Sequence, residues 1–389
     1  MCKKNILLFP MRYFIIAGEA SGDLHGSNLV KALKQQDGAA EFCGFGGDLM
    51  EAEGVILLKH YRDMAFMGAI DVIRNLGKIG KNFRLGMEKL LEYQPDVLIL
   101  IDYPGFNLKM AKFAHDRGIK VFYYILPKVW AWKEWRVKKL KRDVDECFSI
   151  LPFEEEFFRR HGISVHYTGN PLLDAIESSE VDPVSRDSFL RRNGLPDKPL
   201  VALLPGSRVQ EIRMVLPLMT QIAREFPAYR FMISGTPAID PSLYLRYSAD
   251  PSIPVIQGQT YTMLRHAHAA LVTSGTATLE TALIGTPQAV LYRMAGGRLG
   301  YTLFKRIFLK VKFVSLPNLI LGYQAVKEFV MHEMNFDRVK PETDRLLNDP
   351  AYRENIFHHY HVLRERMGEK GASERAAQVM VSLLRGNKK

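Results

Sequence analysis

Short apolar runs alternate along this chain with longer segments whose apolar residues recur at helical spacing. The runs of the first half lie at 13–17, 41–44, 97–101, 120–125, 147–151 and 165–168, and those of the second half lie at 200–204, 230–233, 255–256, 269–272 and 288–292. Parallel strands are covered by helices on both faces and are therefore apolar throughout, as VLILI (97–101) and VFYYI (121–125) are. The alternation predicts an α/β fold with two parallel sheets.

The chain is long enough for two domains, because 389 residues exceed what one ordinary hydrophobic core organises. The polar, turn-rich segment 173–198 separates the two series of strands and is predicted to be a linker. We therefore expect an N-terminal domain over 1–172, a C-terminal domain over 199–350 and a helical segment over 351–389. Two Rossmann-like domains joined in this way predict a cleft, with the carboxyl ends of both sets of strands facing a ligand.

Composition narrows the classes of function. Hydrophobic residues make up 47% of the chain and charged residues 24%, as in folded globular proteins. The three cysteines have neither paired nor metal-binding spacing, which fits a reducing cytoplasm without structural zinc. No apolar run reaches the roughly 18 residues of a spanning helix. The net charge of +11 predicts an acidic partner, which is a nucleic acid, an anionic membrane surface or a phosphorylated substrate.

A strand, a small-residue turn and a helix follow one another at 269–287 and carry the first candidate chemistry. Free N–H groups at a helix N-terminus bind phosphate oxygens, and a glycine lets the phosphate approach the backbone. A glutamate one helical turn later can accept hydrogen bonds from a ribose diol. The predicted contacts are Ser274, Gly275, Thr276, Ala277 and Glu280. An ordinary connection between a strand and a helix remains the alternative.

A second turn follows the run 200–204 and contains Gly206, Ser207 and Arg208. Glu211 lies in the first turn of the predicted helix after it. A guanidinium in this position can clamp a diphosphate by bidentate hydrogen bonds and stabilise charge on a departing nucleotide. A surface arginine at a helix start would have the same sequence, so both interpretations stay open.

The first apolar run leads into AGEASGD (17–23), a turn rich in small residues. Its spacing matches neither GxGxxG nor GxxxxGK[ST], so NAD and ATP are discounted. Gly18, Ser21 and Gly22 are expected to let a sugar or phosphate approach the backbone, and tight packing of strand on helix is the alternative.

Asp102 ends the most apolar run of the first half. Catalytic groups of open α/β sheets lie at the carboxyl ends of central strands. An inverting glycosyl transfer needs one base to take a proton from the attacking hydroxyl, which makes Asp102 the candidate base. The alternative is a carboxylate that caps the turn before Pro104.

No metal site is expected. Asp143 and Asp145 match the DxD pattern of metal-dependent glycosyltransferases, but a three-residue pattern arises easily by chance. A helix N-terminus and Arg208 would neutralise a leaving diphosphate without a cation.

Basic residues cluster with aromatic ones at 64–91, 128–142 and 298–314. In the first of these segments, apolar residues form a helical stripe and the basic residues lie mostly off it. The residues expected to face a membrane are Met67, Ile70, Ile73, Arg74, Lys78, Lys81, Phe83 and Arg84. Such segments suit an anionic bilayer surface, although nucleic acid or packing within the domain would suit them as well.

In their order and spacing, these segments resemble the lipid A disaccharide synthase family. The matching segments are AGEASGD (17–23), MGAIDVI (67–73), IDYPGFN (101–107), KVWAW (128–132), LPFE (151–154), TGNPLLD (168–174), LLPGSR (203–208), SGTATLE (274–280), YRM (292–294) and VSLPNLI (314–320). One position departs from the pattern, because Leu126 stands where the family usually has a serine before the proline of SPxxWAW.

The resemblance implies a GT-B fold, with a C-terminal helix that returns to the first domain. It implies an inverting transfer of 2,3-diacylglucosamine from UDP to 2,3-diacylglucosamine 1-phosphate, without metal or cofactor. The products would be a β-1,6 disaccharide 1-phosphate and UDP, formed at the cytoplasmic face of the inner membrane.

The resemblance also implies roles for single residues. Asp102 would be the base, and Glu19 would be a second catalytic residue that faces the acceptor or donor sugar. Asn318 would join Arg208 and Glu280 at the nucleotide. Exchange of the C-terminal helix between chains would give a homodimer. The alternatives are another UDP-sugar enzyme, such as a UDP-N-acetylglucosamine 2-epimerase, and a nucleic-acid-binding protein, which leaves SGTATLE and IDYPGFN without a purpose.

Overall fold

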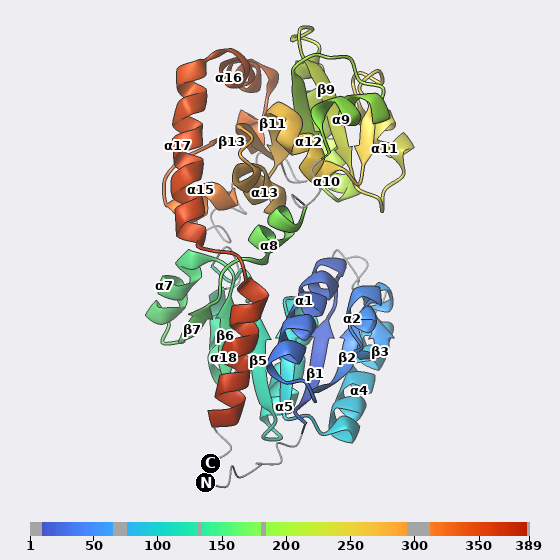
Figure 1. Ribbon diagram of the computed structural model, residues 1–389, viewed down its shortest axis with the longest axis vertical. Coiled ribbons are helices and arrows are strands. Elements are labelled where there is room, and N and C mark those ends of the chain that lie inside the picture. Colours follow the sequence, from blue (N-terminus) through green and yellow to red (C-terminus); the bar gives the residue numbers. More distant parts are fainter. Residues whose placement is uncertain (1–9, 65–75, 131–133, 180–183, 294–311, 387–389) are drawn as a thin grey trace, which may run out of the picture. The chain divides into compact units, whose positions relative to one another are not determined.

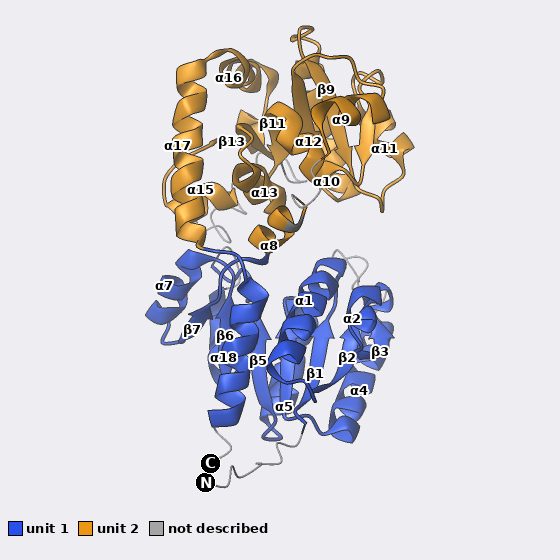
Figure 2. Ribbon diagram, in the orientation of Figure 1, with its two compact units in different colours: residues 1–171, 369–389 blue, residues 172–368 orange. Residues whose placement is uncertain are grey.

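The computed structural model describes residues 10–64, 76–130, 134–179, 184–293 and 312–386 (Figure 1). The chain forms two compact units (Figure 2). Unit 1 comprises Met1–Pro171 and Glu369–Lys389, and unit 2 comprises Leu172–Gly368. Each predicted apolar run forms a strand of a parallel sheet, which confirms the α/β fold class.

Unit 1 is built on a seven-stranded parallel sheet in the order β3-β2-β1-β4-β5-β6-β7. Its strands are β1 (Arg12–Ala17), β2 (Glu41–Gly46), β3 (Ile56–His60), β4 (Val97–Ile101), β5 (Lys120–Tyr124), β6 (Glu146–Ser149) and β7 (Val165–Tyr167). Its helices are α1 (Ala20–Gln36), α2 (Asp48–Ala52), α4 (Leu76–Tyr93), α5 (Pro104–His115), α6 (Val137–Asp143), α7 (Pro152–Arg160) and α18 (Ala372–Gly386).

Alternate residues of each strand point to opposite faces, so unit 1 has one apolar layer on each side of its sheet. Ile15 and Ile99 pack in the layer that α1 and α18 cover, whereas Ile16 and Leu98 pack in the layer under α5 and α6. Helix α18 contributes the fully buried Met380 to the first of these layers. The last helix of the chain therefore completes the core of the first unit, as predicted.

Unit 2 is built on a six-stranded parallel sheet in the order β10-β9-β8-β11-β12-β13. Its strands are β8 (Leu200–Leu204), β9 (Arg230–Gly235), β10 (Val255–Gln257), β11 (Ala267–Thr273), β12 (Gln288–Tyr292) and β13 (Lys327–Val330). Its helices are α8 (Pro171–Ser178), α9 (Arg186–Arg192), α10 (Val209–Ala223), α11 (Pro241–Tyr247), α12 (Thr260–His266), α13 (Thr276–Ile284), α15 (Leu316–Leu321), α16 (Phe336–Asn348) and α17 (Pro350–Met367).

The segment 173–198, predicted as a linker, holds most of α8 and all of α9. Ser185 caps α9 by accepting a hydrogen bond from the Ser188 amide. The predicted helical segment 351–389 is divided between the two units, and Gly368 and Gly371 have positive φ angles between α17 and α18.

Two edge strands, β3 and β13, were not among the predicted runs. The sequence of β3 ends in Lys59 and His60, its Ile56 is 63% exposed, and β13 begins with Lys327 and Glu328. Edge strands carry charged side chains that discourage pairing with other chains, and this composition hides them from a search for apolar runs.

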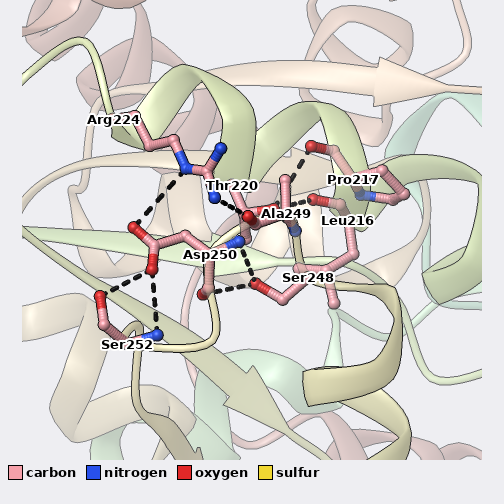
Figure 3. A network of polar contacts seen from close by, with 8 residues as sticks. All are labelled: Leu216, Pro217, Thr220, Arg224, Ser248, Ala249, Asp250 and Ser252. Carbon is pink, nitrogen blue, oxygen red and sulfur yellow. Dashed lines mark hydrogen bonds and ion pairs between the residues drawn. The ribbon is translucent and has the colours of Figure 1, made fainter.

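Figure 3 shows a polar network that joins α10 to the segment before β10. A surface pocket that shares Arg224, Asp250 and Ser252 with this network lies at the amino ends of β8 and β9. Thr220 of α10 accepts a hydrogen bond from the Ala249 amide at 2.8 Å, and the Asp250 carboxylate accepts one from the Ser252 hydroxyl at 2.7 Å. The pocket has a volume of about 320 Å³ and is lined by Lys198, Arg224 and Arg230, among others. None of the site residues predicted from the sequence lines it.

Candidate functional site

The turn after β4 has a backbone conformation that side chains seldom adopt. Asp102 and Tyr103 have φ angles of 43° and 46°, in the left-handed region that favours glycine. The Asp102 carbonyl accepts hydrogen bonds from the Tyr123 hydroxyl at 2.6 Å and from the Asn107 amide at 2.8 Å. The Asn107 amide also donates to the carbonyl of Ile101 at 3.1 Å. These contacts hold the strained turn at the carboxyl end of the central strand.

The Asp102 carboxyl lies in surroundings that suit a proton acceptor. Its burial raises its pKa, and the charge of Lys128 and a hydrogen bond from the Tyr103 amide lower it in part. Tyr103 is the N-cap residue of α5, and it forms no side-chain cap. The hydrogen bond from the Tyr103 amide also gives the Asp102 carboxylate a contact within the turn before Pro104, as the alternative role requires.

The AGEASGD turn packs directly on this turn. A Cβ atom at Gly18 would overlap the ring of Tyr103, and one at Gly22 would lie 3.3 Å from the Cβ of Ala17. The Tyr103 hydroxyl donates a hydrogen bond to the Met64 carbonyl at 2.7 Å. Gly18 is thus required by packing against Tyr103, which supports the alternative that this turn is a tight strand–helix connection.

Two further residues of that turn lie at the start of α1. Glu19 is its N-cap residue, and its negative charge contributes to raising the pKa of Tyr103, after burial of the phenol. Ser21 is exposed in the first turn of the helix. The buried Asp23 accepts hydrogen bonds from backbone amides at the start of α2, including that of Gly47 at 2.8 Å.

A buried carboxyl connects the LPFE and KVWAW segments. Glu154 of α7 accepts a hydrogen bond from the Trp130 indole at 2.8 Å and another from the Ser149 hydroxyl. Burial raises the pKa of Glu154 to about 7. Glu154 had no predicted role. Its hydrogen bond from Trp130 fixes the segment that carries Lys128, whose charge acts on Asp102. Leu126 of the same segment is buried among apolar residues.

In unit 2, the turn after β8 is organised by Glu211. Its Oε2 accepts hydrogen bonds from the amides of Ser207 at 3.1 Å and Arg208 at 3.3 Å, and its Oε1 pairs with Arg208 Nη1 at 3.0 Å. Gly206 has a φ of 104°, and a Cβ there would overlap the Glu211 carboxylate. Glu211 therefore orients Arg208, whose side chain is 62% exposed. This is a supporting role within the turn, and direct binding of the nucleotide by Glu211 stays a prediction.

The turn after β11 leads into α13 with its small residues outward. Gly275 and Thr276 are exposed, and Ala277 is half-buried. The Ser274 hydroxyl donates to the Val314 carbonyl at 2.7 Å, which ties this turn to the segment before α15. Glu280, four residues after Thr276 on α13, accepts a hydrogen bond from the Tyr261 hydroxyl at 2.8 Å. Burial raises the pKa of Glu280, and that hydrogen bond lowers it.

Asn318 is buried and its side-chain amide is fully used within unit 2. Its Nδ2 donates to the Val326 carbonyl at 2.9 Å and to Glu328 at 2.8 Å. Its Oδ1 accepts from the amides of Ala325 at 2.7 Å and Val326 at 2.9 Å. An amide group offers two donors and an acceptor with two lone pairs, so these four contacts occupy it. In this structure Asn318 shapes the segments before and after α15, and its contact with the nucleotide stays a prediction.

Glu328 of β13 joins this segment to the sheet. Its carboxylate accepts hydrogen bonds from the amides of Val314 and Ser315, each at 2.9 Å, and from the Ser315 hydroxyl at 2.6 Å. Because Val314 also accepts from Ser274, Glu328 and Asn318 together support the turn at the start of α13. Sequence analysis missed Glu328 because it lies on the unpredicted edge strand.

The DxD pair shows two separate structural roles. Asp143 is buried and pairs with Arg142, with the Arg142 Nη2 and Asp143 Oδ2 atoms 2.7 Å apart. Asp145 accepts a hydrogen bond from the Val121 amide at 2.7 Å. Within the described ranges, no group of three or more His, Cys, Asp or Glu residues is arranged to hold a metal ion.

Of the predicted membrane-facing segment 64–91, the structure describes residue 64 and residues 76–91. Met67, Ile70, Ile73 and Arg74 lie outside the described residues. Lys78, Lys81 and Arg84 are exposed on α4. The half-buried Phe83 ring packs edge-on against Phe106, with centroids 5.8 Å apart, on the core of unit 1, and its contact with a membrane stays a prediction. No helix among the described residues is long and apolar enough to cross a membrane.

Comparison with known proteins matches the chain to a single family along most of its length. Residues 13–382 match the lipid-A-disaccharide synthetase family. The lipid-A-disaccharide synthase of Myxococcus xanthus is 38% identical over 96% of this chain and 98% of its own, and that of Trichlorobacter lovleyi is 37% identical over the same shares. The chain belongs to the lipid-A-disaccharide synthase family. As a member of this family it is a glycosyltransferase of lipid A disaccharide formation.

Solved structures with the same fold have much lower sequence identity. A putative UDP-N-acetylglucosamine 2-epimerase from Listeria monocytogenes covers 98% of both chains with a TM-score of 0.68 and 13% identity. The calicheamicin glycosyltransferase CalG4 covers 98% of this chain and 100% of its own, with a TM-score of 0.55 and 12% identity. These structures confirm the predicted GT-B fold, while the family assignment rests on sequence.

Replacing Asn318 by alanine should destabilise unit 2 by about 3 kcal/mol or more, because two backbone amides and Glu328 lose their partner. Asn318→Asp should lose additional stability as pH rises, because a second carboxylate then faces Glu328. Thermal unfolding measures both effects. Asn335→Ala, which removes the cap of α16, is the control and should cost about 1 kcal/mol. Equal melting temperatures for Asn318→Ala and wild type would contradict the structural role.

Proposed function

We propose that the enzyme transfers 2,3-diacylglucosamine from UDP to 2,3-diacylglucosamine 1-phosphate with inversion at the anomeric carbon. The acceptor hydroxyl attacks that carbon, its proton passes to Asp102, and the bond to the UDP oxygen breaks. The products are the β-1,6 disaccharide 1-phosphate and UDP. The observation that carries the proposal is the carboxyl of Asp102, held on a strained turn after β4 in a member of this family.

The nucleotide is assigned to unit 2. The exposed guanidinium of Arg208 and the amides at the start of α13 supply positive charge against the departing diphosphate. Ser274 to Ala277 form the turn that admits the phosphates, and Glu280 is the acceptor for the ribose hydroxyls. Because these groups provide the charge, no metal ion or cofactor enters the proposal.

The sugar and lipid parts of the substrates are assigned to unit 1. Glu19 and Ser21 lie at the start of α1, on the turn that packs against Tyr103 beside Asp102. The exposed Lys78, Lys81 and Arg84 on α4 suit an anionic membrane surface, and we place the enzyme on the cytoplasmic face of the inner membrane. Nucleic acid is not a proposed partner.

Replacing Asp102 by asparagine should lower disaccharide formation by 10²-fold or more, the effect of removing a general base. The assay combines UDP-diacylglucosamine with diacylglucosamine 1-phosphate in EDTA and separates the product by thin-layer chromatography. UDP binding, measured by calorimetry, should not change. Asp116→Asn, which alters an exposed carboxylate of unit 1, is the matched control and should keep full activity. Comparable product from Asp102→Asn and wild type would remove Asp102 from the role of base.

The raised pKa of Asp102 predicts how activity and stability each change with pH. Activity should fall as pH is lowered through that pKa, because only the ionised carboxyl accepts a proton. The folded state binds this proton more tightly than the unfolded chain, so the contribution of Asp102 to stability is lost as pH rises through the same range. At neutral pH, Asp102→Asn should therefore unfold at no lower temperature than wild type.

Charge reversal on α4 tests the membrane surface. The triple variant Lys78→Glu, Lys81→Glu and Arg84→Glu should sediment much less with vesicles that contain anionic lipid, because it loses about 1 kcal/mol of attraction for each basic group near the surface. The matched control reverses three exposed arginines of unit 2, Arg191, Arg192 and Arg246, and should sediment like wild type. Equal loss in both variants would show attraction by net charge alone, and no loss in the α4 variant would remove α4 from the proposed surface.

A further inference from the structure

Tyr261 contacts the residue that the proposed function assigns to ribose. It lies on α12, which packs beside α13, and its hydroxyl donates a hydrogen bond to Glu280 Oε1 at 2.8 Å. Both side chains are half-buried. Burial of the phenol, and then the charge of Glu280, raise the pKa of Tyr261, so the hydroxyl keeps its proton and remains a donor. No role was predicted for Tyr261 from the sequence.

The contact fixes a torsion that the helix leaves soft. The last torsion of a glutamate side chain is broad, so a carboxylate on α13 turns easily about its own axis. A donor bound to Oε1 sets the carboxylate plane and leaves Oε2 and the second lone pair of Oε1 to accept from a ligand. A hydroxyl pair such as a ribose diol needs both acceptors at fixed places.

The helix that carries Tyr261 is itself held in place. Thr260 and Ser234 share a hydrogen bond of 2.8 Å between their hydroxyls. Arg265 donates to the carbonyls of Ser179 at 2.9 Å and Ile176 at 3.0 Å. The Tyr261 hydroxyl therefore approaches Glu280 from a rigid support.

We propose that Tyr261 is a positioning residue for ribose recognition, which holds the Glu280 carboxylate in the orientation that accepts the 2′- and 3′-hydroxyls of the nucleotide. This inference rests on the proposed assignment of Glu280 to the ribose. It predicts that Tyr261 acts through Glu280 and has no separate effect on the diphosphate.

Calorimetry with the full chain tests the inference through two probes, UDP and 2′-deoxy-UDP. A site built to accept a hydroxyl discriminates against a ligand that lacks it, so wild type should bind UDP about tenfold or more tightly than 2′-deoxy-UDP. Tyr261→Phe should bind UDP about tenfold more weakly and 2′-deoxy-UDP almost unchanged, which brings the two affinities within about threefold. In a Glu280→Ala background, adding Tyr261→Phe should change neither affinity.

The matched control removes the same kind of contact elsewhere in unit 2. Tyr352 donates to the buried Glu342, and Tyr352→Phe should retain the wild-type discrimination even where it lowers the melting temperature. Discrimination retained by Tyr261→Phe, or a further loss in the Glu280→Ala background, would overturn the inference and leave the proposed function intact. Wild type that binds UDP without discrimination would overturn the ribose assignment and the inference together. Wild type that fails to bind UDP would overturn the proposed nucleotide site.

Discussion

Two hydrogen bonds to one carbonyl hold the arrangement on which the rest of unit 1 depends. The Asp102 carbonyl accepts from Tyr123 on β5 and from Asn107 on α5, and both donors come from elements that pack in the core. They compensate for a turn whose two non-glycine residues have positive φ angles. The turn places the Tyr103 ring against Gly18, so the glycine-rich turn after β1 is shaped by the turn after β4.

Three glutamates of unit 2 lie in or near the candidate nucleotide turns, and they differ in which groups donate hydrogen bonds to them. Glu211 binds the amides of the turn after β8 and orients Arg208, and Glu328 binds the segment that supports Ser274. Glu280 differs from these two, because a phenol donates to it and its carboxylate is not used by backbone amides in the described contacts. For this reason we assign Glu280, and neither of the other two glutamates, to the ribose hydroxyls of the substrate.

The sequence predicted the fold and the strand ends because both follow from local patterns. Continuous apolar runs identified the central strands and placed Asp102 at the end of one of them, and small residues after two other runs identified the turns that carry Arg208 and Ser274. The sequence held no information on roles that depend on contacts between distant segments. Asn318 lies in a matching motif, and only the fold shows that its amide is consumed by Ala325, Val326 and Glu328.

The same limit applies to single helices. Phe83 shares a helical stripe with residues expected at a membrane, but the position of α5 turns its ring toward Phe106. Tyr261 and Glu328 carry no motif, and their partners Glu280 and Asn318 are 19 and 10 residues away along the chain. A pattern in one segment cannot show such pairs.

We propose that one carboxyl, Asp102, acts as base in a single displacement, which inverts the anomeric carbon. The most direct measurement is the anomeric configuration of the disaccharide that wild type forms from an α-linked UDP donor, determined by proton NMR from the coupling between H1 and H2. A single displacement gives a β linkage from the first turnover onward. An α linkage would mean retention at the anomeric carbon, which one displacement from the opposite face cannot give, and it would contradict the proposed mechanism.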